Sequence, residues 1–90
     1  MKRHVSILVS GRVQGVFYRA SAKTKAEELG ITGFVQNLPD GAVYIEAEGT
    51  DEVLDRFKTW CAEGPPRAHV ERVEIKEAAL QNFTSFAIHR

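Results

Sequence analysis

The sequence contains a single cysteine, no long apolar run and no excess of either charge. With Cys61 alone, no internal disulfide can form, and one thiol suits a reducing compartment. No apolar run approaches the ~18 residues of a membrane-spanning helix, and residues 5–9 are too short for the apolar part of a signal peptide. We therefore expect a cytoplasmic protein with no membrane partner.

The balance of charge also limits the partners of the protein. Twelve Lys and Arg residues offset twelve Asp and Glu residues, so no long-range positive field gathers nucleic acid. Any anion must be recognised locally. The hydrophobic fraction of 43% and the length of 90 residues are typical of one globular domain with a modest core, which we expect to span residues 1–90.

Two periodicities alternate along the chain. Some stretches alternate apolar and polar side chains, as half-buried strands do, and others repeat apolar side chains at helical spacing. Thr50 is a good N-cap for a helix, and Pro39-Asp40-Gly41 is typical of a hairpin turn. The expected strands lie at residues 5–9, 31–38, 42–48, 69–76 and 86–88, and the expected helices at residues 18–29 and from Thr50 to Gly64.

This β-α-β-β-α-β order, with a short fifth strand, predicts an α+β, ferredoxin-like split βαβ fold. Two helices should cover one face of an antiparallel sheet, with Val73 and Ile75 pointing inward and a bulge or irregular entry near Val70. The first two strands then run the same way, with the third between them. Their C-terminal ends share one edge with the loop of residues 11–18, where we expect the functional site.

That loop contains two glycines and opens directly into the first helix. The free N–H groups and the positive dipole end of a helix N-terminus favour an anion, and loop amides can form a phosphate cradle. The spacing matches neither the Walker motif nor Gly-x-Gly-x-x-Gly. By spacing alone, both a plain turn and an anion site remain open.

Arg19 and Asn37 are the strongest candidates for chemistry at this edge. Arg19 stands in the first helical turn, where the dipole prefers an acid, and a bound anion would explain its placement. Asn37 shares strand parity with Val35, so its amide should face the helix-covered side and could hold a water. The alternatives are a solvated surface arginine and an asparagine that serves the following turn.

Other polar residues favour structural roles. The three histidines lie on separate segments without cysteines or carboxylates at ligand spacing, so we expect no metal site. Cys61 belongs to the apolar stripe of the second helix and should be a buried, inert thiol. Glu46 and Glu48 lie opposite the apolar face of their strand, which predicts a solvated sheet face.

Two ordered motifs resemble both signatures of the acylphosphatase family: residues 11–19 (GRVQGVFYR) and residues 33–43 (GFVQNLPDGAV). The match extends along nearly the whole chain. It implies a metal-free, cofactor-free hydrolase of small-molecule acyl phosphates in which Arg19 holds the phosphate and Asn37 orients the attacking water. It also implies that phosphate or sulfate can bind in the site, and that the protein is a monomer. The implied phosphate-binding residues are Gln14, Gly15, Val16, Phe17, Tyr18 and Arg19.

Two other function classes share this fold. RNA-recognition domains have the same element order, and Gly33-Phe34-Val35 faintly echoes one of their motifs. The rest of that motif is missing, and the neutral charge and the lack of an aromatic trio disfavour it, so we expect no nucleic-acid partner. A non-catalytic anion sensor differs only in turnover. An acyl phosphate assay tests the sensor, and a gel shift tests RNA binding.

Overall fold

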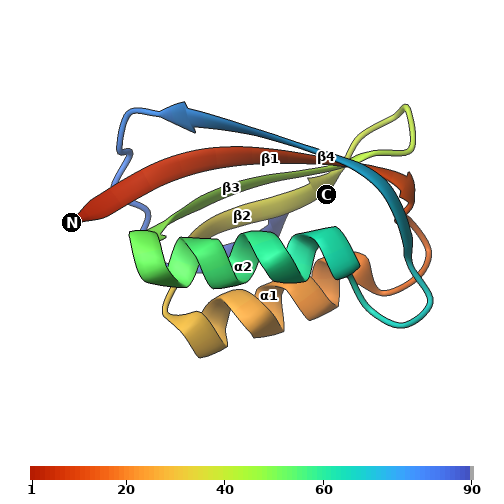
Figure 1. The fold of residues 1–90 in the computed structure, drawn as a ribbon, viewed down its shortest axis with the longest axis horizontal. Coiled ribbons are helices and arrows are strands. Elements are labelled where there is room, and N and C mark those ends of the chain that lie inside the picture. Colours follow the sequence, from red (N-terminus) through yellow and green to blue (C-terminus); the bar gives the residue numbers. More distant parts are fainter. Residues whose placement is uncertain (90) are drawn as a thin grey trace.

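The helices and strands follow the expected order, with the fifth strand at the end of the chain. The computed structural model describes residues 1–89. The strands are β1 (Lys2–Arg12), β2 (Thr32–Asn37), β3 (Val43–Thr50), β4 (His69–Ala78) and β5 (Phe86–His89), and the helices are α1 (Tyr18–Leu29) and α2 (Asp51–Glu63). Both helices cover one face of a sheet ordered β4-β1-β3-β2-β5 (Figure 1). The predicted ferredoxin-like fold is confirmed.

Local signals at the helix ends act as expected. The Thr50 hydroxyl accepts a hydrogen bond from the Val53 N–H at 3.5 Å, and Asp51 and Glu52 follow in the first turn of α2. Gly30 ends α1 in the left-handed conformation, with its N–H directed to the carbonyl oxygens of that helix's last turn. Within residues 1–89, neither helix is long and apolar enough to cross a membrane.

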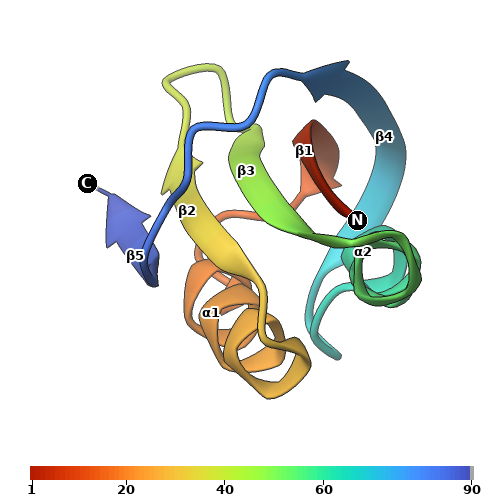
Figure 2. The same cartoon turned by 90° about the vertical axis from the view of Figure 1, so that its left-hand side faces the viewer.

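The fifth strand corrects one expectation about the sheet. The pairs among β1, β2, β3 and β4 are antiparallel, but β5 pairs parallel to β2, so the sheet is mixed. β4 ends at the end of the sheet where β2 begins. The segment that follows runs across this end of the sheet, and β5 then starts beside the beginning of β2 and runs in the same direction (Figure 2). β1, β2 and β5 consequently end at the same edge.

The fourth strand shows the irregularity expected near Val70, but one of its two inward-pointing residues is exposed. Its pairing with β1 shifts register between Ser10 and Gly11, opposite Val70, which confirms the expected bulge or irregular entry. Val73 packs against the core as expected, but Ile75 is 42% exposed. β4 is an edge strand beside β1, so correct parity is not enough to bury Ile75.

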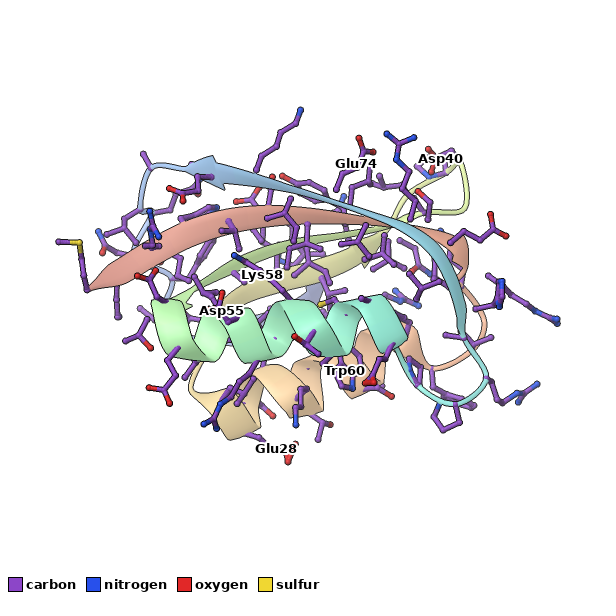
Figure 3. All side chains as sticks on the ribbon, in the orientation of Figure 1. Glu28, Asp40, Asp55, Lys58, Trp60 and Glu74 are labelled. Carbon is purple, nitrogen blue, oxygen red and sulfur yellow. The ribbon has the colours of Figure 1, made fainter. Side chains whose placement is uncertain are left out.

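The core lies between the sheet and the helices. The inward positions of β1 are fully buried, as their alternation predicts: Val5, Ile7 and Val9. Trp60 of α2 is directed toward α1 (Figure 3), and its ring centroid lies 5.3 Å from that of Tyr18. The site loop therefore leaves a well-buried strand and enters a helix whose first residue is anchored, which gives the site a rigid support.

Candidate active site

The loop between β1 and α1 has a backbone shaped by two residues with positive φ. Gly15 has φ 75° and Phe17 has φ 65°, while Val16 between them is outside the left-handed region. Such alternation of backbone hand lets successive N–H groups form an anion-binding concavity. Phe17 is the N-cap of α1, yet its side chain makes no cap hydrogen bond. The start of the helix therefore keeps its N–H groups uncapped.

These N–H groups also lack other partners. Within residues 1–89, no backbone N–H of residues 14–19 donates a hydrogen bond, and the first bond of α1 runs from the Ser21 N–H to the Phe17 carbonyl at 3.1 Å. The first turn of α1 contains no acidic residue. Free donors and the positive helix end favour an anion here.

Arg19 and Asn37 meet beside this loop in one pocket of about 320 Å³. Asn37 ends β2 with the parity of the buried Val35, as the sequence predicts, and its Oδ1 atom is buried without a hydrogen-bond partner among residues 1–89. Arg19 is half-buried, and its Nη1 atom lies 3.5 Å from the His89 carbonyl oxygen, a long contact. Both side chains therefore retain hydrogen-bonding capacity for a ligand.

The pocket contains four of the six residues implied to bind phosphate: Gly15, Phe17, Tyr18 and Arg19. Val16 is buried in the core instead. Gln14 is directed to the β2–β3 turn, where its Nε2 atom donates to the carbonyl oxygens of Leu38 and Ala42, both at 2.8 Å. Gln14 thus braces the loop against the end of the strand that carries Asn37, and its side-chain amide donates to this turn rather than into the pocket.

Tyr18 and Cys61 connect the two helices. The Tyr18 hydroxyl donates to the Cys61 carbonyl oxygen at 2.7 Å, and burial raises the pKa of this phenol above its ordinary value. Burial likewise raises the pKa of the Cys61 thiol to about 12, which confirms the expected buried, inert cysteine. Neither side chain is set to act as a nucleophile or a base.

Ile88 is a part of the pocket that sequence reasoning missed. It lines the pocket from β5, where it pairs with Val35 of β2. The alternation of Phe86 and Ile88 places both on one face of a strand, but only the parallel pairing with β2 brings Ile88 to this edge. The sequence held no signal for that pairing.

A second polar cluster lies on the sheet face opposite the helices, and it corrects the prediction of a solvated face. Glu48 is 1% exposed and Glu46 is partly buried. The donors to Glu48 are the backbone N–H groups of Gln81, Asn82 and Phe83 and the Nδ1 atom of His4. The connection between β4 and β5 therefore covers this part of the sheet. Burial alone would raise the pKa of Glu48, but these donors outweigh it and lower that pKa.

Comparison with known proteins shows which family the chain and its fold resemble. The acylphosphatase family model matches residues 5–88. The chain is 55% identical over 91 residues to the acylphosphatase of Methylococcus capsulatus, across 100% of this chain and 98% of that protein. The acylphosphatase structure from Coxiella burnetii matches with a TM-score of 0.95 at 39% identity, and the match covers 98% of this chain and 93% of that chain. That from Bacillus subtilis has a TM-score of 0.95 at 33% identity over 100% of both chains.

The fold, the loop and the relatives therefore define the class of protein. The chain belongs to the acylphosphatase family. It is accordingly a hydrolase of acyl phosphates.

Proposed function

We propose that this hydrolysis takes place in the pocket between the 14–19 loop and the end of β2. The phosphate binds the loop N–H groups and Arg19, and Asn37 orients the attacking water. One observation carries the assignment: Arg19 and Asn37 come from different elements and line the same pocket, beside a loop whose N–H groups are free within residues 1–89.

Arg19 suits the phosphate because its planar guanidinium can form two parallel hydrogen bonds to phosphate oxygens. Its contact with the His89 carbonyl is long, so turning toward a ligand costs little. As the bond to the acyl oxygen breaks, charge spreads over the equatorial phosphate oxygens. The guanidinium and the loop N–H groups stabilise this charge.

Asn37 suits the water because its amide both donates and accepts hydrogen bonds. Its buried Oδ1 atom lacks a partner among residues 1–89, and an unsatisfied buried acceptor in a native protein often serves a function. An oriented water attacks phosphorus without the entropic cost of finding its position.

The leaving group makes so small a site sufficient. Hydrolysis expels a carboxylate, whose conjugate acid has a pKa of about 4, so no general acid is needed. Positioning and charge stabilisation then suffice, and we propose that the reaction needs neither a metal nor another cofactor.

We also propose that the enzyme acts as a cytoplasmic monomer, and that inorganic phosphate or sulfate competes for the same site. The single, buried Cys61 suits a reducing compartment. Sedimentation at micromolar concentration should show one chain per particle. Cell fractionation should place the enzyme with cytoplasmic markers.

The roles of Arg19 and Asn37 predict different defects. Arg19→Ala should weaken phosphate binding and turnover together, and Arg19→Lys should recover little because it lacks the bidentate fork. Asn37→Ala should bind phosphate nearly normally while turnover falls on the order of 10²-fold.

Phosphate titrations and single-turnover release of phosphate from acetyl phosphate measure both effects, with circular dichroism as the folding control. A phosphate monoester should remain almost untouched. If Asn37→Ala keeps most of its turnover, or loses phosphate binding as Arg19→Ala does, the water-orienting role is wrong.

A further inference from the structure

Two exposed apolar side chains flank the charged part of the pocket. Among residues 1–89, the large hydrophobic side chains that are exposed are Met1, Phe17, Ile75, Leu80 and Ile88. Of these, Phe17 is 70% exposed, Ile88 is 36% exposed, and both line the pocket of Arg19 and Asn37. Apolar surface exposed inside a concave site is typical of a binding surface.

The backbone at Phe17 gives no structural reason for an aromatic ring. With φ 65° and ψ 24°, the residue occupies the left-handed region, where glycine and asparagine are favoured and a bulky side chain is strained. Its side chain does not cap α1, and its ring lies outside the core. Neither capping nor packing therefore explains the ring.

The pairing of β5 sets Ile88 next to the proposed water site. Ile88 pairs with Val35 of β2, and Asn37 follows two residues later on the same face of that strand. Phe17 stands two residues before Arg19 at the start of α1. The contact between Arg19 and the His89 carbonyl joins the two sides. The apolar residues thus flank both polar ones.

We propose that Phe17 and Ile88 contact the acyl group of the substrate and make the enzyme selective for acyl phosphates with a large apolar acyl group. This inference rests on the proposed phosphate site. When Arg19 and the loop hold the phosphate, the acyl carbon is one bridging oxygen away, so the acyl chain leaves the phosphate site beside these residues. A long chain covers Phe17 and Ile88 from water, whereas an acetyl group is too short to do so.

The test compares kcat/KM for hexanoyl phosphate with kcat/KM for acetyl phosphate. The two leaving carboxylates are of nearly equal acidity, so the ratio reports contacts with the acyl chain rather than chemical reactivity. We expect the wild-type enzyme to favour hexanoyl phosphate on the order of 10²-fold, and Ile88→Ala to reduce this preference about tenfold, since each methylene in an apolar site can count by that factor or more.

The position of Phe17 is tested by two variants. Asparagine tolerates the left-handed backbone, so Phe17→Asn removes the ring without adding strain and should also reduce the preference about tenfold. Phe17→Leu keeps an apolar side chain and should retain most of it. The matched control is Ile75→Ala, an isoleucine of another strand that is 42% exposed and outside the pocket. This control should leave the ratio unchanged.

The outcomes separate this inference from the proposed function. If the wild-type enzyme shows no preference, or if Ile88→Ala and Phe17→Asn keep the wild-type ratio, the acyl contact is wrong while the phosphate site stands. If the wild-type enzyme releases phosphate from neither substrate, the proposed function fails, and the acyl contact fails with it. The backbone N–H of residue 17 belongs to the loop, so Phe17→Asn could disturb phosphate binding. In that case the kcat/KM ratio of Ile88→Ala alone decides whether the acyl contact is correct.

Discussion

Glu48→Gln should destabilise the protein, although the substitution removes only a charge. The Glu48 Oε2 atom accepts from the N–H groups of Gln81 and Asn82 and from His4, and Oε1 accepts from the Phe83 N–H at 3.0 Å. A glutamine has one acceptor oxygen and one NH2 group. Whichever way its amide turns, the NH2 group faces at least one N–H donor, either the part-buried Phe83 N–H or the group of donors that includes the buried His4, and that donor is left without an acceptor.

The magnitude follows from those contacts. A donor left without a partner costs about 1–3 kcal/mol when it is buried, as His4 is, and less when it is part-buried, and each remaining bond loses its charge-assisted share. Removing the charge also relieves the cost of burying it, but several donors around one carboxylate outweigh that relief. We expect the free energy of unfolding to fall by about 3 kcal/mol, which lowers Tm by roughly 12–24 °C for a domain of this size.

Urea denaturation at pH 7 measures this loss. The control is Glu74→Gln on β4 (Figure 3), because the ion pair of Glu74 with Arg72 is exposed. This substitution should change the free energy of unfolding by about 0.5 kcal/mol or less. The lowered pKa of Glu48 means that its contribution is complete above the unfolded-state pKa of about 4.3 and is lost as pH falls through the folded-state pKa. A loss below about 1 kcal/mol at pH 7, or one that does not shrink in acid, would refute the anchoring role of this carboxylate.

Three further predictions concern the site. Gln14→Ala removes two hydrogen bonds between the loop and the β2–β3 turn, so stability should fall by about 1–3 kcal/mol in urea denaturation and phosphate affinity should fall with it. Millimolar phosphate should raise Tm of the wild-type enzyme and compete with acetyl phosphate, and both effects should vanish in Arg19→Ala; purely non-competitive inhibition would contradict the loop site. Exhaustive chelation should leave turnover intact, and an activity restored by one divalent ion would contradict a metal-free mechanism.

The parts of the fold that the sequence predicts are those set by neighbouring residues. Thr50 caps α2 and Gly30 ends α1 because each signal acts within one turn. Parity along a strand is equally local, and it places Ile75 and Glu48 on the correct faces. What covers a face is not local: Ile75 stays exposed at the sheet edge, and Glu48 is buried under a connection more than 30 residues away.

The parallel pairing of β5 with β2 is likewise not determined by neighbouring residues. A strand of four residues has too few side chains to indicate which strand it pairs with or in which direction. Gly33 shows what such long-range packing demands. Its φ is 143°, and a Cβ atom there would lie 1.9 Å from the Glu46 carbonyl oxygen, so β2 can approach β3 at this point only without a side chain. The sequence presents this glycine as part of a motif, and the structure supplies its physical reason.

The same distinction between local and long-range information separates the site residues that the sequence predicts from those that it does not. Arg19 and Asn37 could be brought together from the sequence because the topology fixes which strand and helix ends meet at one edge. The side chain of Gln14 could not be placed, since its partners Leu38 and Ala42 lie 24 and 28 residues away and spacing holds no information on that distance. Those two carbonyl groups flank the turn that follows Asn37. A shift of about 1 Å between a phosphate and its attacking water is enough to slow a reaction substantially. Gln14 therefore fixes the distance on which the proposed chemistry depends, because it joins the loop that offers N–H groups to the strand end that offers the amide.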